Sequence, residues 1–128
     1  MPINAFTSPD QNLVIGPLAM ISDPNNSQNA TQAVATGSAA IALKPGDSAI
    51  KLSAAAATTG ASLPPGSFDG QILFITVVSA AANTITFAAA GTSNVAGGTT
   101  VSLAGLATHL FRWDAGAALW YQVGPATN

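Results

Sequence analysis

The sequence predicts an all-β fold: a single β-sandwich or jelly-roll-like domain with an extended N-terminal arm. Three observations support this prediction. Short apolar runs separated by Gly, Pro and Asn recur from Ser38 onward, and almost no stretch shows a helical period. No repeat of fixed length is present, which argues against a solenoid or a propeller. A length of 128 residues suits one domain with a real core.

The chain carries unusually little charge. Charged residues make up 6% of the sequence, whereas hydrophobic residues make up 48%. A typical soluble domain is roughly 25% charged, because charge keeps its surface hydrated. One interpretation is a small β-protein with an uncharged Ala, Thr, Ser and Asn surface. The other, which we favour, is that an assembly covers much of the surface, where charge would be desolvated at a cost.

The composition also argues against several classes of partner. The only bases, Lys44, Lys51 and Arg112, are scattered, whereas phosphate binding requires clustered cations. The chain has no cysteine, and its first residues lack the basic and apolar regions of a secretory signal. The longest strongly apolar run, Ile72–Val78, is far shorter than the ~18 residues of a membrane-spanning helix. We therefore expect neither nucleic acid nor membrane as a partner.

Residues 1–37 are predicted to form the arm, and residues 38–128 the β-domain. Four prolines and an Asn-rich cluster at 25–29 give residues 1–37 a polar, irregular pattern. An apolar patch at 13–21 interrupts it, either as a first strand packed on its own domain or as an anchor that binds a neighbouring subunit. Its candidate contact residues are Leu13, Val14, Ile15, Leu18, Met20 and Ile21.

The first elements of the β-domain are short. Ala40–Leu43 and Ala49–Leu52 flank Lys44–Asp47, where Pro and Gly occupy the two central positions of a type II turn. This arrangement predicts a hairpin. Ser53–Gly60 is rich in Ala and Thr, and both a tight strand or loop and one helical turn fit it.

The later elements are more regular. Polar and apolar residues alternate in most of them, as in half-buried strands, and the first is a continuous apolar run typical of a buried strand. Gly91–Thr99 is predicted to be a loop and Asp114–Ala117 a turn. The predicted strands are Gln71–Ser79, Thr84–Phe87, Thr100–Leu103, Thr108–Trp113 and Leu119–Val123.

Groups that could carry catalysis are rare. His109 is the only histidine and shares a strand parity with Phe111 and Trp113, so we interpret it as an interior or interface residue, with a pH sensor or axial metal ligand as the alternative. The aspartates all stand beside turn-forming residues or at strand ends, where Asp caps its own backbone. They are Asp10, Asp23, Asp47, Asp69 and Asp114. The pattern predicts no enzyme, no metal and no cofactor.

Aromatic residues cluster near the C-terminus, where Trp113 and Trp120 flank a predicted turn. One interpretation is hydrophobic packing within a small β-domain, and the other is a platform for a sugar ring or a partner subunit. The candidate residues for a trimer interface or ligand platform are His109, Phe111, Trp113, Trp120 and Tyr121.

Five motifs between Gln71 and Val123 carry a family resemblance. They are Gln71–Val77, Thr84–Phe87, Gly97–Gly98, Phe111–Asp114 and Trp120–Tyr121. Together they resemble the small β-domains of bacteriophage virion proteins, which include capsid decoration (cement) proteins, head fibres and tail-fibre modules. The resemblance implies a homotrimer of β-sandwiches on the outer capsid surface of the virion, gripping the shell through an N-terminal segment. It implies no catalytic residues.

Two functions are therefore expected. The first is a structural virion protein, a capsid decoration protein that clamps neighbouring major capsid subunits and stabilises the head. The alternative is a head- or tail-fibre module that binds a host surface glycan through Trp113, Trp120 and Tyr121. A polysaccharide hydrolase that depends on Asp69 or Asp114 is retained only as a hypothesis to test.

Overall fold

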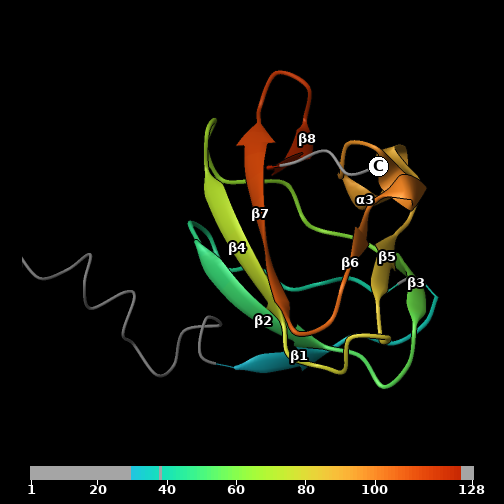
Figure 1. The fold of residues 1–128 in the computed structure, drawn as a ribbon. Coiled ribbons are helices and arrows are strands. Elements are labelled where there is room, and N and C mark those ends of the chain that lie inside the picture. The colour runs from blue at the N-terminus through green and yellow to red at the C-terminus, as the bar shows by residue number, and fades with distance from the viewer. Residues whose placement is uncertain (1–29, 38, 125–128) are drawn as a thin grey trace, which may run out of the picture.

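Two β-sheets face each other in the computed structural model, which describes residues 30–37 and 39–124 (Figure 1). The larger sheet has the strand order β1-β2-β4-β7-β8, and the smaller sheet the order β3-β5-β6. The strands are β1 (Thr31–Ala33), β2 (Ala49–Ser53), β3 (Thr58–Ala61), β4 (Ile72–Val77), β5 (Ile85–Phe87), β6 (Ser102–Leu103), β7 (Ala107–Asp114) and β8 (Leu119–Val123). This arrangement confirms the predicted all-β sandwich.

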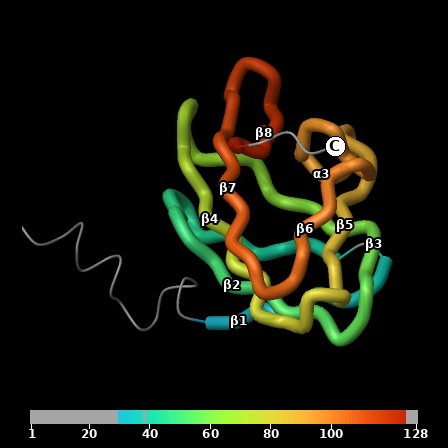
Figure 2. Tube along the Cα trace, viewed as in Figure 1, coloured from blue at the N-terminus to red at the C-terminus, as the bar shows by residue number. Residues whose placement is uncertain are grey.

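The core lies between the two sheets. Phe87 on β5 and Phe111 on β7 meet edge to face, with ring centroids 6.0 Å apart, and so join the layers. Such aromatic contacts add specific geometry to the area they bury. In Figure 2 the tube of β7 runs along the larger sheet and turns back as β8. No helix among the described residues is long and apolar enough to cross a membrane.

The larger sheet is mixed, and one predicted hairpin is wrong. β2 pairs in parallel with both β1 and β4, and Ala40–Leu43 forms no strand. Ala40 instead makes an isolated parallel bridge with Ser62. The Gln32 side chain bonds both the amide (2.9 Å) and the carbonyl (2.8 Å) of Ala42. The turn at Lys44–Asp47 is present nonetheless, closed by a 3.0 Å bond from the Asp47 N–H to the Lys44 carbonyl.

β1 lies within residues 1–37, the range assigned to the arm. Thr31 pairs with Lys51 in the sheet, and the Val34 N–H donates to the Ser53 carbonyl at 2.8 Å. The described part of the predicted arm therefore contributes an edge strand to the larger sheet. The candidate anchor at 13–21 lies outside the described residues, so both of its interpretations stay open.

The strands predicted in the second half are confirmed, with small differences at their ends. Ser53–Gly60 was expected to be a tight strand or loop, or one helical turn. The strand-or-loop alternative is present, because residues 54–57 form a loop between β2 and β3. The predicted loop Gly91–Thr99 overlaps two short helices, α3 (Ala90–Ser93) and the 3-10 helix η2 (Gly98–Thr100). A helix of this length has no periodic pattern by which sequence could reveal it.

Candidate functional site

The aromatic cluster is built on the hairpin of β7 and β8. Trp113 and Trp120 are opposite each other, with ring centroids 5.3 Å apart, and they are only 5% and 0% exposed. The Trp120 indole N–H donates to the Pro64 carbonyl at 2.9 Å, which satisfies its one polar atom inside the protein. The packing interpretation is therefore confirmed for these two rings. Strand alternation turns both rings toward the core, so neither presents a face on the surface of this domain.

The five candidate residues do not form one surface. Phe111 lies on the same inward face of the larger sheet as the two tryptophans and is fully buried. His109 is half-buried on this inward parity, with Nε2 3.2 Å from the Ala104 carbonyl oxygen. Tyr121 faces the opposite way, is 41% exposed, and pairs with Arg112 on β7. Only Tyr121 of the four aromatic candidates is available on the surface of the described chain.

The three described aspartates each accept a backbone N–H bond. Asp47 and Asp114 cap their own turns, as predicted, whereas Asp69 accepts from the distant turn between β7 and β8. The bonds are Asp47 from the Lys44 N–H (2.8 Å), Asp69 from the Ala115 N–H (2.9 Å) and Asp114 from the Ala117 N–H (3.0 Å). Asp10 and Asp23 lie outside the described residues. Within residues 30–37 and 39–124, no group of three or more His, Cys, Asp or Glu could hold a metal ion.

A stripe of apolar side chains covers the outer face of the larger sheet. On β4, Leu73 and Ile75 point into the core, whereas Ile72 and Phe74 point outward. Strand register places Phe74 beside Leu110 on β7, and Leu110 beside Val123 on β8. We define the outer-face patch as Ile72, Phe74, Val78, Leu110, Tyr121 and Val123. Of the patch residues, only Tyr121 was among the predicted site residues, although the continuous apolar run of β4 indicated that this strand is apolar on both faces.

The smaller sheet has a different outer face. Its outward residues include Thr86 on β5 and Ser102 on β6, whose hydroxyl groups hydrogen-bond at 2.9 Å. Hydroxyl side chains of this kind are readily hydrated. The two outer faces of the sandwich therefore differ in chemistry, and only the larger sheet presents an apolar stripe.

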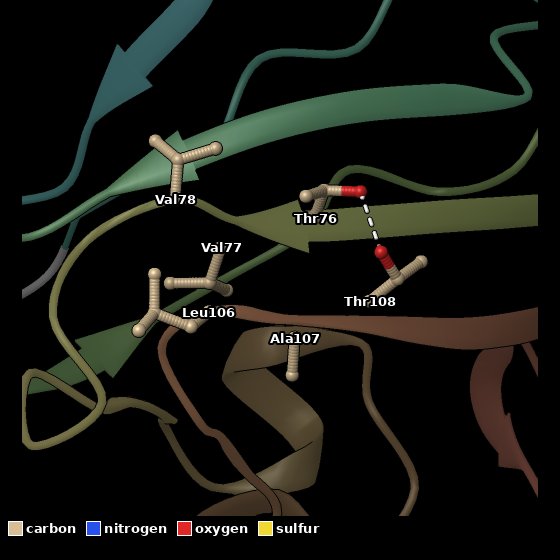
Figure 3. A pocket seen from close by; sticks show the side chains of 6 residues that line it. All are labelled: Thr76, Val77, Val78, Leu106, Ala107 and Thr108. Atoms are coloured by element: carbon tan, nitrogen blue, oxygen red, sulfur yellow. Dashed lines mark hydrogen bonds between the residues drawn. The ribbon is translucent and has the colours of Figure 1, made fainter.

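An open groove of about 310 Å³ lies at one end of the patch (Figure 3). Thr76 on β4 and Thr108 on β7 face each other there, with their hydroxyl oxygens 2.9 Å apart. Leu106 lies just before β7 and is 72% exposed, with a backbone φ of 57°. The groove is lined by Thr76, Val77, Val78, Leu106, Ala107 and Thr108.

These features define a class of protein, a small β-sandwich domain with a buried aromatic pair and an apolar outer face on one sheet. The family model of the phage depolymerase C-terminal beta sandwich domain matches residues 32–121, and the chain belongs to this family. The match begins in β1 and ends in β8, so it includes both sheets. Membership makes the chain a phage virion-associated β-domain. No curated protein and no solved structure matched the chain.

Proposed function

We propose that this chain is a structural, non-catalytic module of a tail-associated phage virion protein. The family match carries the proposal, because it spans both sheets of the described fold and relates them to the C-terminal sandwich of phage depolymerases. In this role the sandwich supports assembly of the virion protein. The proposal keeps the tail location of the fibre module that the sequence offered as an alternative function. It replaces the glycan-binding role of that module with a role in assembly.

The packing of the aromatic cluster supports assembly over glycan recognition. A sugar platform needs an exposed aromatic face, whereas Trp113 and Trp120 pack against each other, with their rings tilted by 57°, inside the domain. Tyr121 alone of the proposed platform remains on the surface. Replacing Trp113 or Trp120 is therefore expected to destabilise the fold rather than to remove a ligand contact.

We also propose self-association, with the homotrimer as its expected form. The low charge of the chain favours close contact between copies, because few groups must be desolvated. Many equivalent copies on a virion add their weak contacts as avidity. The trimer itself rests on the resemblance to phage virion domains.

Capsid decoration is the second candidate, and the apolar patch at 13–21 favours it. In that role the patch would contact the major capsid protein. Full-length protein carrying Leu18→Asp would then fail to bind capsids from which the wild-type chain has been removed. A matched change at Thr7→Asp, outside the patch, would leave binding intact. Equal binding by both variants would remove the observation that favours decoration.

Immunogold labelling of intact phage particles tests where the chain resides. Gold at the tail supports the tail-associated module. Gold spread over the head contradicts it and supports decoration. Absence of the chain from purified particles, checked by mass spectrometry of dissociated virions, would overturn both.

A further inference from the structure

We propose that the outer face of the five-stranded sheet is the surface through which copies of this chain bind one another. The patch of Ile72, Phe74, Val78, Leu110, Tyr121 and Val123 would form its apolar centre, and Leu106 would project beside it. The inference deepens the proposed function, because it rests on the proposed self-association and names the surface responsible.

The first argument is the location of exposed apolar side chains. Seven large hydrophobic residues are exposed in the described chain, and six of them belong to the patch or to the adjoining groove. The seventh, Phe68, lies in the loop before β4. Isolated exposed apolar residues need no explanation, but contiguous ones mark interaction surfaces.

The second argument is the composition of β4. Apolar residues occupy both faces of this strand, which is the pattern of a strand buried on both sides. The core covers Leu73, Ile75 and Val77 completely, whereas Phe74 on the outer face stays 45% exposed. A second copy packed on the outer face would bury β4 on both sides, as its composition predicts.

The third argument is the conformation of Leu106. A φ of 57° is rare for a leucine, because its Cβ crowds the backbone there. The preceding Gly105 fixes the turn, since a Cβ at that position would collide with the carbonyl oxygens of Ser79 and Ala80. The turn thus holds an exposed leucine beside the groove at an energetic cost. Burial of this side chain in an interface would offset that cost.

Charge identifies another copy as the occupant. The same face carries Lys51 and Arg112 on one hand and Asp114 on the other, so it presents both signs around an apolar centre. A surface of this kind complements itself, because Arg112 of one copy can meet Asp114 of another. The described residues also hold equal numbers of acids and bases, and the full chain has a net charge of only −2, so charge repulsion between copies is weak. The acids are Asp47, Asp69 and Asp114, and the bases are Lys44, Lys51 and Arg112.

Light scattering across a concentration series tests the surface. The full-length protein is expected to be an oligomer, and Phe74→Ser to weaken its association at least about tenfold, as removal of a central aromatic contact does. Phe68→Ser is the matched control, because it removes the same side chain from an exposed loop position. A full-length protein that stays monomeric overturns the proposed self-association. If Phe74→Ser and Phe68→Ser form equally stable oligomers, the proposed surface is wrong, but the proposed self-association stands.

Disulfide trapping gives a second measurement, since the chain has no cysteine of its own. Leu110→Cys is expected to cross-link copies under mild oxidation, whereas Ser102→Cys, on the outer face of the smaller sheet, is not. Cross-linking at Ser102→Cys alone would contradict the proposed surface. If the protein is monomeric and Leu110→Cys resists a thiol reagent, the face is covered by the chain's own remaining residues. If the cysteine reacts freely, the face is left for an unlike partner. Both results overturn the proposal.

Discussion

At the scale of single residues, Leu106 shows how stability and assembly can oppose each other. Its left-handed backbone costs free energy in each copy, and Asn tolerates that conformation better. We expect Leu106→Asn to raise the free energy of unfolding of the monomer by about 0.5–1 kcal/mol and to weaken association of copies. Urea denaturation of dilute protein and light scattering measure the two effects. A variant that is more stable and associates as before would show that Leu106 lies outside the interface.

Gly66 is a second residue with a specific packing role. A Cβ at this position would collide with the ring of Trp113, and the backbone there is not left-handed, so the effect of Ala is steric. We expect Gly66→Ala to lower the free energy of unfolding by about 1–3 kcal/mol, the usual cost of overpacking. Gly91→Ala is the control, because open space surrounds that position and it lies in α3. Equal stability of the two variants would contradict the packing of Trp113 against Gly66.

At the scale of elements, local pattern predicted some strands better than others. β8 matches its predicted range because the turn at Asp114–Ala117 precedes it and Gly124-Pro125 follows it in the sequence. β2 was predicted as a strand but with the wrong partner, because its parallel neighbours β1 and β4 are distant or inconspicuous in sequence. The inward direction of Trp113 was one of two predicted options, and only the pairing of β7 with β4 and β8 decides it. The outer-face patch required the same knowledge, since alternation alone does not say which face is covered.

Gln71 links two elements that are far apart in sequence. Its buried amide donates to the Asp47 carbonyl at 2.8 Å and accepts from the Ser67 N–H, so it joins the turn before β2 to the start of β4. Gln71→Met keeps the volume but leaves both backbone groups without this partner. We expect the free energy of unfolding to fall by about 1–3 kcal/mol in urea denaturation.

Gln122→Met is the control for this change, because Gln122 is an exposed residue of β8. Its effect should stay within about 0.5 kcal/mol, as for most surface substitutions. If Gln122→Met lowered the free energy of unfolding as much as Gln71→Met does, the polar link between β2 and β4 would have no special part in stability.

At the scale of the whole molecule, low charge and the apolar patch predict that assembly stabilises the fold. A ligand that binds only the folded state raises apparent stability with its concentration, and here the ligand is another copy of the chain. We expect the melting temperature of the full-length protein to rise as its concentration rises, and that of Phe74→Ser to change little. Differential scanning calorimetry over a hundredfold range of concentration measures this. A concentration-independent melting temperature of the wild-type oligomer would mean that its subunits fold independently of one another.

The same balance of forces predicts the response of the assembly to salt. Charged residues make up 6% of the chain, and a surface ion pair such as the one proposed between Arg112 of one copy and Asp114 of another contributes about 0–1 kcal/mol. High salt screens such pairs, whereas burial of Phe74 and its apolar neighbours does not depend on them. The association constant from light scattering is therefore expected to change by less than about fivefold between 0.1 and 1 M NaCl, the most that loss of one such pair would allow. Dissociation in 1 M NaCl would show that ion pairs, rather than the apolar patch, hold the copies together.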